Sequence, residues 1–226
     1  MSDLNITIES GKSKRMLVAG TMPRKNIIVT ALGSNYEQGV KDGKQEAIHH
    51  FWDIIQTNGE TSGFIYAFSG YCLTDEIYNP VRPIITTGSS NSSYMFSHAT
   101  RLTSTKVPII IDNSNQWLSN LFTWCYNLKT IPSIKVTENV CIYSSWFDFC
   151  WALEEINFTE DSVIKANISF KDSSKLNASS VNSIIHALKD LTGETAQTLT
   201  FHADVGAKLT EEQKAAITAK NWNLVY

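Results

Sequence analysis

The chain has 226 residues, which is long enough to bury a sizeable core in one or two domains. Hydrophobic residues make up 42% and charged residues 18%, and 19 Lys and Arg against 22 Asp and Glu give a formal net charge of −3. This composition argues against a disordered chain and against general attraction to nucleic acid. No apolar run reaches the about 18 to 20 residues that span a bilayer, and the start lacks the pattern of a signal peptide, so we expect neither membrane insertion nor Sec export.

The first 60 residues predict a small β-element followed by one helix. Residues 4–8 alternate as a strand does, and residues 26–31 form a second apolar, β-branched strand candidate. A capping-box sequence at 34–37 then begins a helix that runs to Ile55, before Asn58 and Gly59. We therefore expect residues 1–60 to form a separate N-terminal module.

Small residues form a stripe on this predicted helix, at Gly39, Gly43 and Ala47. Glycine in a helix interior costs about 1 kcal/mol relative to alanine, so two at this spacing indicate close approach of another backbone. The stripe therefore predicts a packing or attachment face. Its partner is either the β-element of the same chain or another subunit.

A repeat of about 25 residues is the main signal after residue 60. Phenylalanines recur at Phe68, Phe96, Phe122 and Phe147, with spacings of 28, 26 and 25, and in the last three copies a leucine follows six residues later. Strand candidates follow these leucines at 106–111, 130–134 and 155–158, and the rhythm continues at 167–170, 198–201 and 223–226. A unit holding one short strand and one short helical turn cannot bury its own apolar face, so we expect neighbouring units to stack as a solenoid.

The pattern F-x-x-C-x-x-L followed by I-P-x-I resembles the BspA-like class of leucine-rich repeat, found in bacterial surface proteins and phage tail proteins. The resemblance covers roughly residues 64 to 202, with Ala99 in place of one cysteine. It implies an α/β protein in which an irregular leucine-rich-repeat solenoid occupies residues 61–226.

Two helices and a last strand are predicted to cap the C-terminal end. Val181, Ile184, Ile185, Leu188 and Leu191 follow one helical face after the cap candidates Ser179 and Ser180, and Gly193 is placed to end this helix. A capping box at 210–213 begins the second helix, which continues to about Lys220. The final strand follows directly.

Three segments outside the repeats also resemble phage proteins. The segments 14–20 with 25–30 are similar to a short N-terminal module of tail and baseplate proteins, and 36–45 with 51–59 to a segment that precedes such repeats. The segment 188–222 looks like the end of leucine-rich proteins encoded by phages and prophages of Gram-positive bacteria. These resemblances imply a virion component that is assembled in the bacterial cytoplasm.

Signatures of catalysis and cofactor binding are absent from the sequence. It contains no G-x-G-x-x-G, P-loop, H-E-x-x-H or G-x-S-x-G motif, so we expect no enzyme, no cofactor and no metal. His49 and His50 point about 100° apart on a helix and cannot easily share one metal ion. Acidic pairs such as Glu154 and Glu155 are interpreted as exposed loop residues, because a glycosidase would need a carboxylate separation that sequence does not give.

Cysteines and aromatic residues cluster in the repeats. The four cysteines lack metal-ligand spacing, and Cys125 and Cys150 share one repeat position, which predicts a column of buried thiols. Aromatic residues surround them, including Phe149, and either fill the core of the turns or form a surface for sugars or protein. The candidate binding residues are Trp117, Trp124, Tyr126 and Trp151.

The leading hypothesis is therefore a non-enzymatic tail, baseplate or fibre-associated virion protein. Residues 1–60 would attach it to other virion proteins, and the solenoid would present a surface to a glycan or protein of the host cell envelope. Weak contacts add up when several copies bind together, so we expect a homo-oligomer, with a trimer as the guess. The alternatives are a purely structural spacer or decoration protein, a bacterial leucine-rich-repeat adhesin and, last, a carbohydrate-active enzyme.

Overall fold

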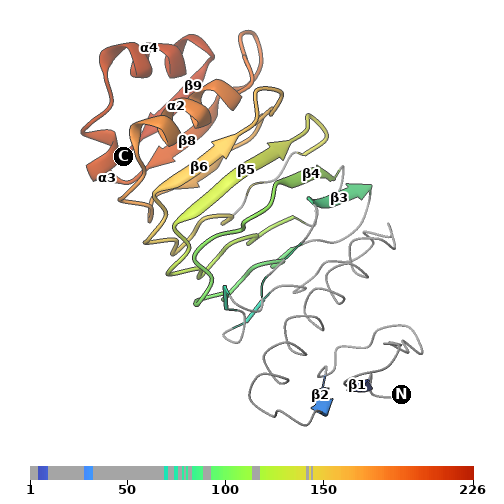
Figure 1. Ribbon diagram of the computed structural model, residues 1–226. Coiled ribbons are helices and arrows are strands. Elements are labelled where there is room, and N and C mark those ends of the chain that lie inside the picture. Colours follow the sequence, from blue (N-terminus) through green and yellow to red (C-terminus); the bar gives the residue numbers. More distant parts are fainter. Residues whose placement is uncertain are drawn as a thin grey trace. The chain divides into compact units, whose positions relative to one another are not determined.

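The computed structural model describes residues 5–9, 28–32, 69–70, 74–75, 78, 80, 83–88, 93–113, 118–140, 143 and 145–226. The chain forms two compact units, Met1–Thr57 and Asn58–Tyr226. Parallel strands and a few short helices build it, so the predicted α/β class is confirmed at that level (Figure 1). Within the described ranges, no helix is both long and apolar enough to cross a bilayer.

The described residues of the N-terminal unit form a pair of parallel strands. β1 (Asn5–Glu9) pairs with β2 (Ile28–Leu32), with Asn5 opposite Ile28 and Glu9 opposite Leu32. Both predicted strands are thus confirmed, with bounds shifted by one or two residues. The predicted helix, with Gly39, Gly43 and Ala47, lies outside the described residues.

The second unit begins with a four-stranded parallel sheet in which each strand pairs with the next along the chain. Its strands are β3 (Ile84–Gly88), β4 (Ile109–Asn113), β5 (Thr130–Val136) and β6 (Glu155–Phe158). The register aligns one buried residue from each strand into a row, namely Ile84, Ile109, Ile134 and Phe158. Figure 1 shows these strands side by side in chain order.

The strand predictions differ from this sheet at its N-terminal end. β4 begins three residues later than predicted, because Lys106 is left-handed (φ 58°) and Pro108 has no N–H to donate. The repeat pattern does not predict β3, because β3 begins eleven residues after Leu73, whereas β5 and β6 begin two residues after their leucines. The predicted strands at 130–134 and 155–158 are confirmed.

Turns join the strands, and they hydrogen-bond to one another from repeat to repeat. The N–H of Phe96 donates to Leu121 O, and the N–H of Phe122 donates to Trp146 O, both at 2.9 Å. The expectation of short helical turns is wrong. Two residues in each turn are left-handed, two before and two after the repeat phenylalanine, so the backbone cannot continue as a helix.

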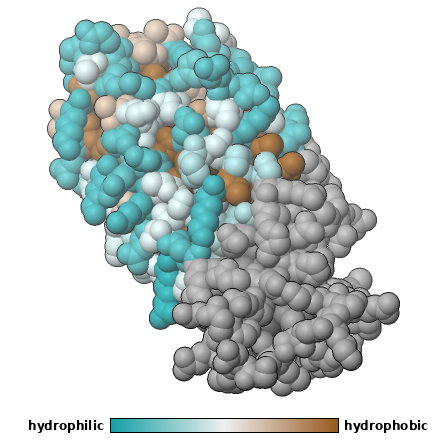
Figure 2. All heavy atoms as spheres, viewed as in Figure 1, coloured by the Kyte–Doolittle hydropathy of each residue, from teal (hydrophilic) through white to brown (hydrophobic). Residues whose placement is uncertain are grey.

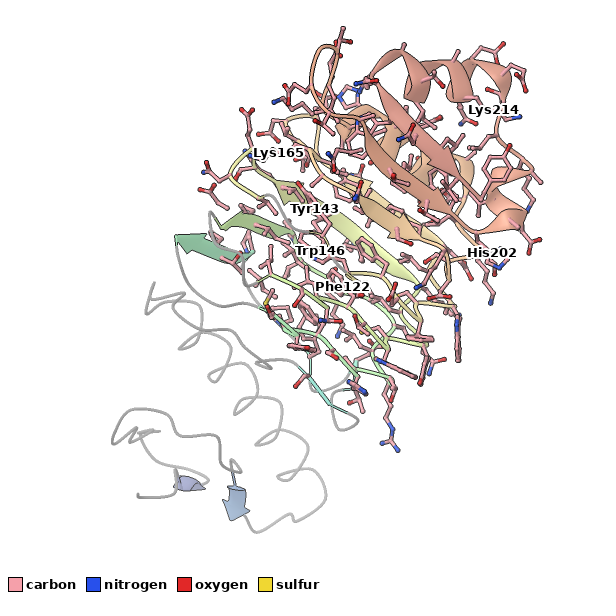
Figure 3. All side chains as sticks on the ribbon, turned by 180° about the vertical axis from the view of Figure 1, so that it is seen from behind. Phe122, Tyr143, Trp146, Lys165, His202 and Lys214 are labelled. Carbon is pink, nitrogen blue, oxygen red and sulfur yellow. The ribbon has the colours of Figure 1, made fainter. Side chains whose placement is uncertain are left out.

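The repeat phenylalanines form a stacked column in the core. Successive ring centroids lie 5.1, 5.6, 4.7 and 6.0 Å apart, and every side chain is at most 1% exposed. The column consists of Phe96, Phe122, Phe147, Phe170 and Phe201. In Figure 3, Phe122 and Trp146 lie inside the stacked repeats, whereas Lys214 lies at the periphery.

The predicted thiol column lies next to the phenylalanines. Cys125 Sγ donates to Phe96 O at 3.0 Å, and Cys150 Sγ donates to Phe122 O at 3.2 Å. Both cysteines are free and fully buried. Burial raises the pKa of the Cys125 thiol to about 12, and burial, followed by the neighbouring Cys125, raises the pKa of Cys150 well above its usual value. Cys72 and Cys141 lie outside the described residues.

A second parallel sheet closes the C-terminal end. It comprises β7 (Ile168–Phe170), β8 (Gln197–Phe201) and β9 (Trp222–Val225), with Ile168 opposite Leu199 and Leu199 opposite Leu224. These are the three C-terminal strands predicted from the sequence. They do not extend the first sheet as the repeat rhythm suggests, because a helix takes the place beside β6.

That helix, α2 (Ala178–Ala187), seals the edge of β6 with serine hydroxyls. Ser180 Oγ accepts from the N–H of Ile156 at 2.9 Å and donates to Glu154 O at 3.2 Å. Ser183 Oγ accepts from the N–H of Phe158 at 2.6 Å and donates to Phe158 O at 3.2 Å. Serine hydroxyls thus bond the N–H groups of Ile156 and Phe158 and the carbonyls of Glu154 and Phe158, which a fifth strand could otherwise pair.

The bounds of α2 correct the prediction. Asn177 caps its N-terminus, accepting from the N–H of Ser180 at 2.8 Å, in place of Ser179 or Ser180. The helix ends at Ala187, well before Gly193, because Leu188 forms a parallel bridge with Ile164. Lys220 Nζ donates to carbonyls at this end of the helix, namely Ile185 O, His186 O and Leu188 O at 2.9, 3.0 and 2.7 Å.

The remaining helices are α3 (Ala203–Gly206) and α4 (Glu211–Ala219). The predicted capping box is confirmed, since Thr210 Oγ1 accepts from the N–H of Gln213 and Gln213 Oε1 accepts from the N–H of Thr210. α4 contacts β9 and α2. Figure 1 shows the helices gathered at the C-terminal end of the unit.

Truncating the centre of the phenylalanine column tests its contribution to stability. Phe122→Ala should lower the free energy of unfolding by about 3–5 kcal/mol, because it leaves a cavity and removes the stacking contacts with Phe96 and Phe147. Urea denaturation followed by circular dichroism measures the change. Phe149→Ala, at a partly exposed site, is the matched control, and an equal loss in both variants would contradict the buried column.

The serine seal on β6 gives a second prediction. Ser180→Ala should destabilise the protein by about 1–3 kcal/mol, because it leaves the buried N–H of Ile156 without its partner. Ser179→Ala, one residue earlier and exposed, should change stability by less than about 0.5 kcal/mol. Equal denaturation midpoints for the two variants would show that the hydroxyl of Ser180 is dispensable.

The raised thiol pKa values predict slow alkylation. At pH 8 a thiol of pKa about 12 is ionised in only about one molecule in ten thousand, and only the thiolate reacts. Cys125 and Cys150 should therefore remain unmodified by iodoacetamide in native protein and react fully in urea. Peptide mass spectrometry reads each site separately, and rapid native labelling of Cys125 would refute its burial.

Candidate recognition surface

Five partly exposed rings form one surface on the turns, here called the aromatic surface. It has two columns, the first made of His98, Trp124 and Phe149 and the second of Tyr126 and Trp151. Trp151 is 51% exposed, and the other four are half-buried. The rings of the aromatic surface therefore lie at the boundary between the core and solvent, where each one contacts another ring.

The first column stands at one backbone position of the repeat, two residues after the core phenylalanine. His98, Trp124 and Phe149 all have left-handed φ angles, of 61°, 67° and 61°. In the preceding repeat the same position holds Gly70, also with positive φ (110°). Glycine adopts such a conformation freely, whereas other residues lose roughly 1–2 kcal/mol there.

Stacking between repeats offsets this strain. The rings of Trp124 and Phe149 stack at 4.0 Å, and those of His98 and Trp124 at 5.7 Å. Each aromatic pair contributes about 0.5–1.5 kcal/mol beyond its buried area, so the ring contacts of Trp124 and Phe149 balance the cost of their left-handed backbone, and the stacking of His98 on Trp124 offsets part of the cost at His98. The N–H of Trp124 also donates to Asp148 O at 2.9 Å, which aligns the two turns.

The second column stands two residues further along each turn. Tyr126 and Trp151 stack at 4.6 Å, nearly parallel at 14°. Edge-on contacts join the columns, from Trp124 to Tyr126 at 5.7 Å and from Phe149 to Trp151 at 6.2 Å. The four rings thus hold one another in fixed orientations.

Three polar groups of the aromatic surface, on Trp124, Tyr126 and Trp151, differ from those of the buried tryptophans. The indole N–H of Trp222 donates to Lys189 O at 2.9 Å, and that of buried Trp146 donates to Leu118 O. Within the part of the chain that the structure describes, the indole N–H of Trp124, that of Trp151 and the hydroxyl of Tyr126 make no hydrogen bond. They are available to solvent or to a bound molecule.

Charged residues border the aromatic surface at its C-terminal end. Asp172 Oδ2 accepts from the N–H of Phe149 at 2.9 Å, and Lys171 Nζ lies 3.4 Å from Asp148 Oδ1. At the other end, Ser97 Oγ and His98 Nδ1 lie 2.8 Å apart. Both ends therefore combine ring edges with hydrogen-bonding groups.

The sequence-based set of binding residues is recovered in part. Trp124, Tyr126 and Trp151 lie together as predicted, whereas Trp117 lies outside the described residues. The predicted set omits His98 and Phe149. Their common position, two residues after each repeat phenylalanine, is the signal that identifies them.

The interpretation of Glu154 and Glu155 as exposed loop residues is corrected, because Glu155 is exposed but begins β6 and Glu154 is half-buried. Two further acidic residues, Asp75 and Asp161, are engaged in other contacts. Asp75 Oδ1 accepts from the N–H of Thr103 at 2.9 Å, and Asp161 pairs with Lys135, whose hydrogen bond lowers the pKa of Asp161 below its usual value. Across the described ranges, no three His, Cys, Asp or Glu side chains are grouped to bind a metal ion. His49 and His50 lie outside these ranges.

Other exposed apolar side chains do not extend the aromatic surface. The large ones among the described residues are Ile85, Val225 and Tyr226, on β3 and at the C-terminus. Figure 2 shows hydrophobic residues only in small, separate patches on the face in view. The aromatic surface is thus the strongest candidate for recognition.

Comparisons with protein families, with curated proteins and with solved structures give no match for this chain.

Proposed function

We propose that the protein is a non-enzymatic virion component, associated with a tail, baseplate or fibre, that binds the host cell envelope through the aromatic surface. The observation that carries the binding role is the set of stacked, partly exposed rings, in which the indole N–H groups of Trp124 and Trp151 and the hydroxyl of Tyr126 make no hydrogen bond among the described residues. The virion assignment rests on the sequence resemblances. Residues 1–60 would attach the protein to other virion proteins.

The proposal includes a leucine-rich-repeat solenoid in the second unit. Support comes from four parallel strands paired in chain order, from turns that hydrogen-bond between repeats and from the phenylalanine column. In a solenoid each repeat contacts only its neighbours and contributes the same position to one continuous surface. The aromatic surface is such a set of equivalent positions.

A binding role fits the chemistry of the aromatic surface better than catalysis does. Tyr and Trp supply a large contact area with few rotatable bonds and one polar group each, which suits recognition. The acidic residue within the turn that carries Phe149, Asp148, is paired with Lys171. The proposal assigns no cofactor or metal. Display of several copies, in a trimer for example, would add weak contacts together.

The test compares binding of labelled protein to intact bacterial cells. The double variant Trp124→Ala, Trp151→Ala should lose at least tenfold in apparent affinity, because it removes a ring from each column. Tyr226→Ala, which removes a ring of similar exposure (53%) outside the aromatic surface, should bind as the unaltered protein does. Flow cytometry over a concentration series gives the saturation curves.

Circular dichroism must show that all variants are folded. Saturable binding that is lost only in the double variant supports host recognition. Absence of binding to every strain tested, with the protein present in purified particles, would instead indicate a structural spacer. Binding that both variants retain would place recognition elsewhere on the chain.

A further inference from the structure

Trp151 stands at the C-terminal end of the second column, and among the described residues no ring stacks on the face turned away from Tyr126, here called its open face. Trp151 stacks on Tyr126 with one face, and its other ring contact is a T-shaped one with Phe149. The repeat continues 23 residues later, as shown by the stacking of Phe147 on Phe170 and by Ser173 Oγ donating to Cys150 O at 3.3 Å. This spacing places Ser174 after Trp151, and a serine is too small to cover an indole.

Hydrogen-bonding groups border this open face. Asp172 uses Oδ2 to accept from the N–H of Phe149, and within the described residues its Oδ1 has no hydrogen-bond partner. The hydroxyl of Ser174 and the indole N–H of Trp151 likewise make no hydrogen bond there. A flat apolar face is therefore combined with one anionic acceptor, one hydroxyl and one N–H donor.

The local charge is balanced. Residues 145–151 and 170–175 contain two aspartates, Asp148 and Asp172, and two lysines, Lys171 and Lys175. A polyanion such as a phosphate-rich polymer would meet two carboxylates here, and a cationic ligand would meet two ammonium groups. The site therefore favours a ligand without net charge.

We propose, building on the function proposed above, that the ligand is a neutral pyranose glycan that stacks on the open face of Trp151. One side of a pyranose ring presents C–H groups as a flat apolar patch, and its rim presents hydroxyls that donate and accept. The C–H patch lies on the indole, and a ring hydroxyl donates to Asp172 Oδ1. Tyr126 and Phe149 act as positioning residues that hold the indole.

The test uses the labelled full-length chain and cells of a strain that it binds. One sample of cells is oxidised with periodate, which cleaves vicinal diols of sugars, and another is digested with proteinase K. Periodate should lower binding at least tenfold, to the level of Trp151→Ala, while proteinase K should leave it unchanged. Loss after proteinase K alone would overturn the glycan and retain host binding through a protein.

Asp172→Asn separates the hydrogen bond to ligand from the fold. The amide oxygen still accepts from the N–H of Phe149, but an NH₂ donor replaces Oδ1, so binding should fall at least threefold with an unchanged unfolding midpoint. Asp204→Asn, exposed in α3, is the matched control and should bind normally. Equal binding by Asp172→Asn and the unaltered protein would overturn the assigned acceptor.

A titration without cells keeps the two proposals distinguishable. Methyl β-glucopyranoside, methyl β-galactopyranoside and N-acetylglucosamine are added to ¹⁵N-labelled protein, with choline as the cationic probe, and the indole N–H signals are followed by NMR. The Trp151 signal, assigned from Trp151→Ala, should shift with at least one sugar and not with choline. A shift with choline alone would overturn the neutral ligand, and no shift with any sugar, together with periodate-resistant cell binding, would overturn the glycan proposal.

Discussion

The backbone pairing between successive repeats is the interaction on which the rest of the second unit depends. Parallel pairing of β3 to β6 and the bonds between turns fix each repeat at one translation from the next. Only with this register do Phe96, Phe122 and Phe147 stack as a core column. The same translation brings Trp124 over Phe149 and Tyr126 over Trp151, so core and surface share one cause.

One position in each turn carries the first column of the aromatic surface. The left-handed position after each core phenylalanine suits glycine, as at Gly70, yet three successive repeats place a ring there. Local strain that persists because its surroundings compensate it is often found at functional positions. Here the compensation comes from stacking on the neighbouring rings. Loss of one ring therefore removes contacts that stabilise the left-handed backbone of the next, and the aromatic surface behaves as a unit.

Sequence predicted the features that repeat and missed those that depend on tertiary context. The spacing of Phe122 and Phe147 predicted the stacked units, and the shared repeat position of Cys125 and Cys150 predicted that both are buried. These predictions succeed because residues at the same position of each repeat have the same structural environment. The left-handed turns carry no sequence signal at His98 or Trp124, where propensity disfavours them. The placement of α2 beside β6 follows from Ser180 and Ser183 meeting strand groups that are distant in the chain, which helical periodicity cannot show.

The serine seal also limits how copies of this chain can associate. An open edge of a parallel sheet is a template on which a neighbouring molecule can add a strand, and repetition of that step produces open-ended fibrils. At β6 the hydroxyls of Ser180 and Ser183 already bond two N–H groups and two carbonyls on which such a strand would pair. An incoming strand would have to displace both serines, so this edge disfavours growth by strand addition.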